Sequence, residues 1–103
     1  MNDEKKIHKD MIKQLKDRNI LESHYISLVD DYMELWNIKN LLIADINERG
    51  VNVEWNNGGG QSGVKKNDSV NELVRVNAQM LKILSELGIR GADIKHIEYD
   101  DEL

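Results

Sequence analysis

The stretch RGVNVEWNNGGG, residues 49–60, decides the fold, because a long helical pattern ends in it and a strand pattern begins. Gly50 tolerates the left-handed backbone that often terminates a helix, and Arg49 places a cation at the negative end of the helix dipole. From Val51 to Trp55, apolar and polar residues alternate as in a strand with one buried face. The stretch therefore predicts a helix, a strand and a tight turn in succession.

A β-hairpin is the natural completion of this pattern. The turn at residues 56–60 holds Asn and Gly, which adopt positive φ readily, and residues 61–65 are predicted to return as a second short strand. The turn lacks both GxGxxG and the Gly-Lys-Ser/Thr of a phosphate-binding loop, so it predicts no nucleotide site. Because an isolated two-stranded ribbon is marginally stable in water, we expect it to pack against helices or a neighbouring subunit.

Two amphipathic helices are predicted before the hairpin. The first covers residues 4–17. The second runs to Arg49, and the spacing of Asn19 and Glu22 predicts a capping box at its start. Its wide apolar face is formed by residues three or four apart, namely Tyr25, Leu28, Val29, Tyr32, Leu35, Trp36, Leu42, Ile43 and Ile46.

A further helix is predicted after the hairpin. Ser69 and Glu72 have capping-box spacing, an apolar period follows to Leu87, and Gly88 and Ile89 are suited to close the helix. Residues 90–97 are expected to add one short helical turn. The predicted fold is mainly α, with a small hairpin between two long helices, in an oligomer. Its segments are a basic N-terminal helix (1–18), a helix–hairpin–helix oligomerisation domain (19–97) and an acidic tail (98–103).

Composition narrows the function classes. A chain of 103 residues has room for one modest core, and domains of this size often gain stability by oligomerising. Cysteine is absent, which excludes disulfides and thiolate metal sites. No apolar run approaches the roughly 18 residues of a membrane span. We expect a soluble, intracellular protein that binds no membrane and uses no cofactor.

Charge is polarised along the chain. Residues 1–18 hold six Lys/Arg against four Asp/Glu, whereas residues 98–103 hold four acids and no base. Cations that displace counterions supply most sequence-independent DNA affinity. Taken alone, the first segment is better explained as an ordinary charged helix. The candidate DNA-binding residues are Lys5, Lys6, Lys9, Lys13, Lys16, Arg18, Lys65 and Lys66.

No catalytic or metal site is predicted. The three histidines, His8, His24 and His96, are scattered, and a solvated helix face explains the carboxylates of Asp30, Asp31 and Glu34. Aromatic and leucine residues at helical spacing indicate packing in a core or between subunits. The predicted oligomer interface comprises Tyr25, Tyr32, Trp36, Trp55, Leu73, Leu81 and Leu84.

The order of these features resembles one family of bacteriophage terminase small subunits. Three local signatures carry the resemblance, which covers about residues 22–97: a Tyr/Trp-bearing helix that ends in ERGVNV (48–53), KNDS (66–69) before the last helix, and LSELGI (84–89). The family commonly opens its last helix with Asn-Pro-Ala, where this chain has Asn67-Asp68-Ser69. It also often has Pro and Arg after the Leu-Gly motif, where this chain continues with residues 90–93.

The resemblance implies a non-catalytic subunit that forms a ring-like oligomer, engages double-stranded viral DNA and recruits or regulates the large ATPase/nuclease subunit during packaging. It assigns the long helices to the ring, the basic residues to DNA and the acidic tail to the large subunit. That tail is equally well explained as a solubilising segment.

Two other classes of protein remain open. A small DNA-binding regulator would read a short palindrome with a recognition helix, but residues 5–18 are not rich in the Gln, Asn, Arg and Ser expected on such a face. We therefore expect weakly selective, salt-sensitive DNA binding. A helical adaptor that binds only protein would show no DNA binding even at low salt.

Overall fold

The computed structural model of the chain describes residues 2–89, which form three helices and one two-stranded antiparallel sheet. The elements are α1 (Asn2–Asp17), α2 (Ser23–Arg49), β1 (Asn52–Asn56), β2 (Ser62–Lys66) and α3 (Asp68–Leu87). The predicted mainly α fold, with a small hairpin between two long helices, is confirmed. The predicted helical turn at 90–97 and the acidic tail at 98–103 lie outside the described residues.

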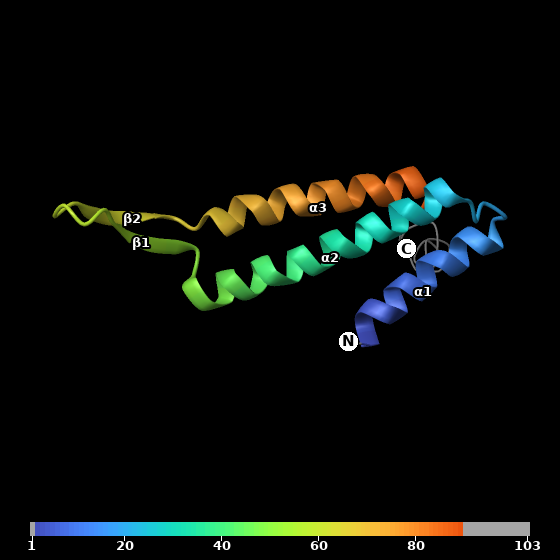
Figure 1. Ribbon diagram of the computed structural model, residues 1–103, viewed down its shortest axis with the longest axis horizontal. Coiled ribbons are helices and arrows are strands. Elements are labelled where there is room, and N and C mark those ends of the chain that lie inside the picture. Colours follow the sequence, from blue (N-terminus) through green and yellow to red (C-terminus); the bar gives the residue numbers. More distant parts are fainter. Residues whose placement is uncertain (1, 90–103) are drawn as a thin grey trace, which may run out of the picture.

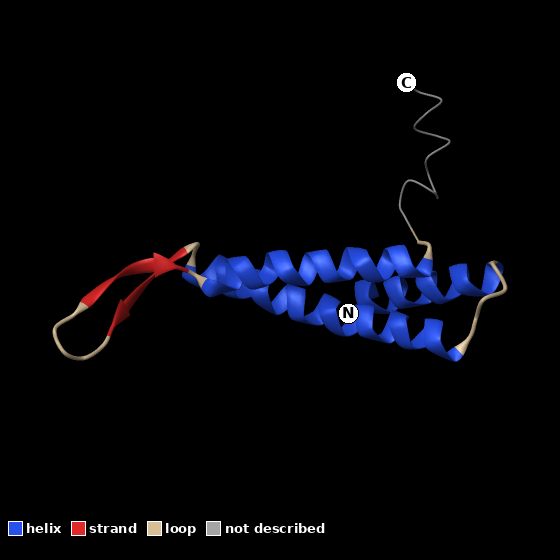
Figure 2. Cartoon of the chain, turned by 90° about the horizontal axis from the view of Figure 1, so that it is seen from above, coloured by secondary structure: helices blue, strands red, loops and turns tan. Residues whose placement is uncertain are grey.

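The helices α2 and α3 lie antiparallel, side by side, and form the long shaft of the protein (Figure 1). Helix α1 folds back along the part of α2 that is distant from the sheet. The sheet continues beyond the other end of the shaft as a projecting ribbon (Figure 2). The α1 end and the ribbon end of the protein are therefore well separated.

The hydrophobic core lies at the α1 end, where all three helices meet. Leu15 of α1, Val29 of α2 and Leu87 of α3 are almost completely buried there. Burying a side chain of this size contributes about 1.5–3 kcal/mol. The remaining buried members of the core are Met11, Met33, Ile83 and Ile89. Because the apolar stripe of α1 completes this core, the opposite face of α1 must point to solvent.

The connection between α1 and α2 differs from the predicted one. Asn19 adopts φ 60°, its N–H donates to Lys16 O at 3.0 Å, and the Ile20 N–H donates to Leu15 O at 2.9 Å. These bonds satisfy the last carbonyls of α1. Asn19 therefore ends α1, and the prediction that it opens α2 by a capping box is wrong, because Asn tolerates the left-handed conformation. Glu22 precedes α2 without a side-chain cap.

The start of α3 also differs from the predicted one. The cap is Asn67, whose Oδ1 accepts the Ser69 N–H at 2.9 Å, so the predicted Ser69–Glu72 capping box is wrong. The Ser69 hydroxyl donates instead to Asp45 on α2. The predicted end of α3 is confirmed. Gly88 has φ 72°, and the Ile89 N–H donates to Leu84 O at 2.8 Å.

The ribbon pairs Asn52 with Lys66 at its base and Asn56 with Ser62 near its turn. Trp55 lies over Gly63, where an added Cβ would come within 3.0 Å of the indole Nε1. Every residue of the two strands except Val53 and Gly63 is exposed. The expected packing of the ribbon against helices is therefore not found among residues 2–89, and packing against a neighbouring subunit stays a prediction.

Candidate nucleic-acid interface

The predicted lysines of α1 form one stripe. At 100° per residue, Lys5, Lys6, Lys9, Lys13 and Lys16 fall within an arc of roughly 100° around the helix. All five are exposed. The opposite side of α1 carries Ile7, Met11 and Leu15, which pack in the core. Core packing therefore holds the five positions, termed here the lysine stripe, toward solvent.

Polar contacts join the N-terminal half of α1 to α2. The Asn37 side-chain amide donates to Glu4 Oε2 at 3.0 Å. His8 Nε2 lies 3.7 Å from Asp30 Oδ1. Neither contact involves a lysine of the stripe, and all five lysines remain exposed.

Within the stripe, Lys13 has a carboxylate partner. Its Nζ donates to Asp17 Oδ2 at 2.8 Å, one helical turn along α1. This hydrogen bond and the negative charge of Asp17 raise the pKa of Lys13. Exposed pairs at this spacing contribute only a few tenths of a kcal/mol, so a phosphate can replace the carboxylate at little cost.

Arg18 stands apart from the lysine stripe. Its guanidinium donates to the carbonyl oxygens of Leu87 and Gly88, at the end of α3. A cation suits this position because the last carbonyls of a helix carry partial negative charge. Arg18 thus joins the α1–α2 connection to α3, and its predicted DNA contact is untested.

The second predicted basic spot lies at the base of the ribbon. Lys65 and Lys66 are consecutive residues of β2, so their side chains extend from opposite faces of the sheet. Lys65 Nζ lies 3.8 Å from Asp68 Oδ2. The ribbon base and the lysine stripe belong to different ends of the shaft (Figure 1), so one protomer presents two separate basic surfaces.

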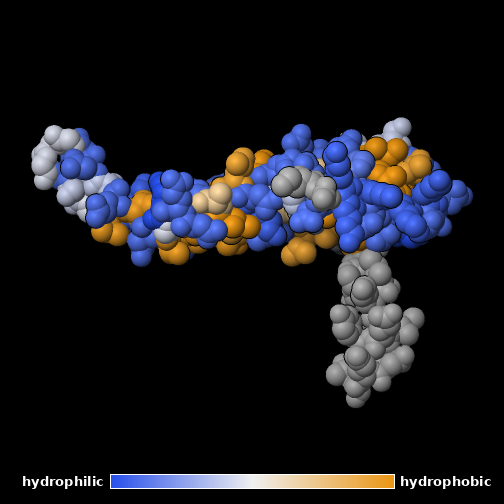
Figure 3. Space-filling view, turned by 90° about the horizontal axis from the view of Figure 1, so that it is seen from below, coloured by the Kyte–Doolittle hydropathy of each residue, from blue (hydrophilic) through white to orange (hydrophobic). Residues whose placement is uncertain are grey.

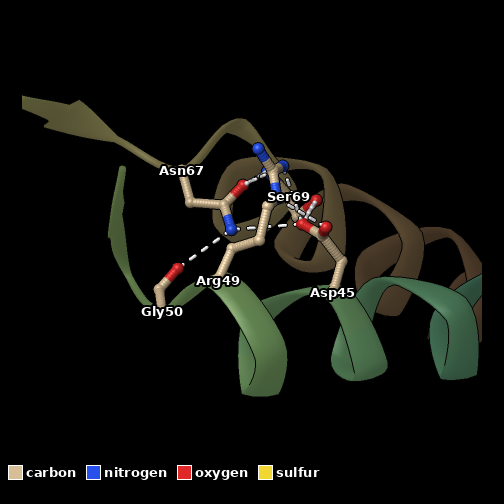
Figure 4. Close-up of polar contacts among 5 residues, drawn as sticks. All are labelled: Asp45, Arg49, Gly50, Asn67 and Ser69. Carbon is tan, nitrogen blue, oxygen red and sulfur yellow. Dashed lines mark hydrogen bonds and ion pairs between the residues drawn. The ribbon is translucent and has the colours of Figure 1, made fainter. Parts of the chain in front are cut away.

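A polar cluster fixes the ribbon to the helices (Figure 4). Asp45 accepts from Arg49 Nε at 2.7 Å and from the Ser69 hydroxyl at 2.7 Å. The Asn67 amide donates to Asp45 Oδ2 at 3.1 Å and to Gly50 O at 2.9 Å. We term these five residues the clasp. Together the donors hold the pKa of Asp45 far below its usual range, with the Arg49 hydrogen bond as the largest cause.

Sequence reasoning missed the clasp. Its one visible signal was the spacing of Asp45 and Arg49, four residues apart on a helix, which is typical of an ion pair. Asn67 carried a family signature, but nothing in its surroundings indicated that it would be fully buried. The clasp joins the end of α2 to the start of α3 and so sets where the ribbon leaves the shaft.

The predicted interface residues divide into two groups. Tyr25, Tyr32, Trp36 and Leu84 are partly buried against the core of the protomer itself. Trp55 on the ribbon and Leu81 on α3 are 40% and 67% exposed, whereas Leu73 is half-buried. Further apolar residues are exposed beside them, and Figure 3 shows such patches along the shaft. They are Leu21, Ile38, Leu41, Val51, Val64 and Val74.

The described part of the chain contains no group of three His, Cys, Asp or Glu residues placed to hold a metal ion. Of the three helices at 2–89, none is long and apolar enough to cross a membrane.

The described residues thus form a helical shaft with an outward lysine stripe and a clasped β-ribbon. The family model described as "Phage terminase, small subunit" matches residues 5–102, nearly the whole chain. The chain therefore belongs to the phage terminase small-subunit family, which has a role in genome packaging and is generally non-catalytic. Neither the curated proteins nor the solved structures include a match to it.

Proposed function

We propose that the protein is the non-catalytic small subunit of a phage terminase, which binds double-stranded viral DNA and recruits or regulates the large ATPase/nuclease subunit. It acts in the host cytoplasm as a homo-oligomer, in the form of a ring. The observation that carries the DNA-binding proposal is the lysine stripe of α1, which core packing holds toward solvent.

The stripe suits a phosphate backbone. Lys5, Lys9 and Lys16 lie near one line along α1, and each cation that neutralises a phosphate releases bound counterions. The contacts carry no sequence information by themselves. One stripe per protomer gives weak binding, but several stripes in an oligomer act together and raise the overall affinity by avidity.

Exposed apolar residues support assembly. Leu81 and Val74 lie two helical turns apart on α3 and are 67% and 63% exposed, and Leu41 on α2 is 71% exposed. Their burial between protomers would add hydrophobic stabilisation to a small single core. Among the predicted interface residues, Trp55 and Leu81 have the exposed side chains best placed for contact between protomers.

A titration of labelled duplex DNA at low salt tests the proposal. Replacing Lys5, Lys9 and Lys16 with Ala removes three charges from the stripe and should weaken binding at least about tenfold. The matched control replaces Lys39, Arg75 and Lys82, three cations of α2 and α3 outside the stripe, and should bind as the original protein does. Equal losses in both variants would overturn the assignment of the stripe, and absence of binding by the original protein would overturn DNA binding itself.

Assembly with the large subunit requires a separate experiment. Residues 98–103 carry four acids and are our candidate contact. Co-purification with the large subunit should be lost on deletion of these residues and retained by the three-lysine stripe variant. Retention by the deletion variant would place the contact elsewhere.

A further inference from the structure

The projecting ribbon has two chemically different faces. Residues directly opposite in an antiparallel pair lie on the same face, and successive residues alternate. One face therefore carries Val53, Trp55, Gly63 and Lys65. The other carries three cross-strand pairs, Asn52 with Lys66, Glu54 with Val64, and Asn56 with Ser62. We term this second surface the amide face.

The amide face holds donors and acceptors rather than net charge. Glu54 and Lys66 balance each other in charge. The other members of the face are two Asn amides, one Ser hydroxyl and the exposed apolar side chain of Val64. Asn pairs with the major-groove edge of adenine, Lys with that of guanine, Ser with several bases, and Glu with the amino group of cytosine. This combination is typical of a surface that contacts base edges, in contrast with the lysine stripe of α1.

The ribbon also has suitable dimensions. Its two strands lie about 4.8 Å apart, and its five pairs span roughly 17 Å. A major groove about 12 Å wide and 8.5 Å deep admits a two-stranded ribbon. The leading turn is open to its surroundings, because an added Cβ at Gly58 or Gly60 would meet no atom within 4 Å.

The position and charge of the ribbon favour DNA, rather than another protein subunit, as the partner that the ribbon contacts. Residues 50–67 hold two lysines against one acid, whereas α2 and its leading connection, residues 19–49, hold six acids against two bases. The duplex is repelled by this part of the shaft and can approach the ribbon that projects beyond it (Figure 2). The clasp at Asn67 fixes the base of the ribbon, so little conformational freedom is lost on binding.

We propose that the ribbon enters the major groove of duplex DNA and that its amide face contacts base edges. This inference rests on the proposed DNA-binding function and adds a source of base selectivity to the charge-driven binding of α1. Asn52 and Ser62 are the test positions. Asn56 is retained, because its Oδ1 accepts the Gly58 N–H at 2.6 Å and shapes the turn.

The experiment measures affinity for two labelled duplexes, one of alternating dA·dT and one of alternating dG·dC sequence, at one fixed salt concentration. The original protein should favour one duplex by about tenfold, which corresponds to a single specific base contact. N52A/S62A should reduce this ratio to about threefold or less, with unchanged salt dependence, because no charge is removed. The control N47A/S85A makes the same two replacements at exposed positions of α2 and α3 and should keep the tenfold ratio.

The outcomes separate the two proposals. If the original protein binds neither duplex at low salt, DNA binding fails and the ribbon inference fails with it. If it binds both equally, or if N52A/S62A keeps the original ratio, the ribbon inference alone is overturned. Circular dichroism and mass must match between variants. If N52A/S62A does not fold, the single variant Ser62→Ala takes its place. This change removes one hydroxyl from an exposed strand position and should also reduce the affinity ratio between the two duplexes.

Discussion

The side-chain amide of Asn67 donates to Asp45 Oδ2 at 3.1 Å, across 22 positions of the chain. Asn67 is 0% exposed and is the buried polar residue of the described chain. Its amide also donates to Gly50 O, while its oxygen accepts from Arg49 and from the Ser69 N–H. One side chain therefore caps α3, binds the end of α2 and fixes the base of the ribbon.

Asn67→Ala should lower the free energy of unfolding by about 1–3 kcal/mol, because it removes an N-cap and leaves buried partners without hydrogen bonds. Urea denaturation followed by circular dichroism measures this loss. Asn71→Ala, at an exposed position of the same helix, should change stability by no more than about 0.5 kcal/mol. Equal effects of the two changes would contradict the role given to the clasp.

Asp45 should make stability depend on pH. The pKa of its carboxyl is lowered in the folded protein from an ordinary value of 3.8, first by Arg49 and then by Ser69 and Asn67. A lowered folded-state pKa gives stability that is complete above 3.8 and is lost as the pH falls toward the lowered value. Asp45→Asn should therefore lose stability at pH 7 and show a shallower decline below pH 3.8. Parallel curves in urea titrations across this range would refute the coupling.

Gly88 and Arg18 should be coupled in stability. Gly88 has φ 72°, and an added Cβ would lie 2.6 Å from Arg18 Nη1. Gly88→Ala should destabilise the protein by about 1–2 kcal/mol through backbone strain, together with displacement of the guanidinium. In the background Arg18→Ala, the same glycine change should cost less, because the displaced group is absent. A double-mutant cycle by thermal unfolding measures the difference, and strict additivity would contradict the contact.

Leu81 should contribute to assembly. Leu81→Glu places a charge at a position that is 67% exposed in the protomer, so it should preserve the fold and reduce the mass measured by light scattering. Lys82→Glu, at the adjacent exposed position, should leave the mass unchanged. If Leu81→Glu retains the original mass, that part of α3 does not lie between subunits.

Elements that repeat a pattern over several turns were predictable, because many residues contribute to each signal. The long apolar period predicted α2, Gly50 predicted its end at Arg49, and alternation from Val51 to Trp55 indicated β1. The residues that cap the starts of α2 and α3 were not predicted correctly. Asn19 suits both the start and the end of a helix. The backbone bond from the Ile20 N–H to Leu15 O, with Ile20 packed on the core, places it at the end.

In the candidate site, too, a repeated pattern was predictable and contacts between distant residues were not. Spacing alone places the lysines of α1 on one arc, and the apolar residues opposite them predict which side is exposed. Nothing in the sequence indicates that Arg18 reaches Leu87, because that contact spans 69 positions and depends on how α1 and α3 meet. The Asn67–Asp45 hydrogen bond could not be predicted from the sequence for the same reason.

The most direct test of the account is the salt dependence of duplex DNA affinity, measured for the original protein and for K5A/K9A/K16A. Each phosphate neutralised contributes about 0.9 to the slope of log K against log salt, so the three-lysine variant should have a slope shallower by about 2.7 or more. K39A/R75A/K82A should keep the original slope. Equal slopes for all three proteins would contradict the claim that the lysine stripe of α1 binds DNA.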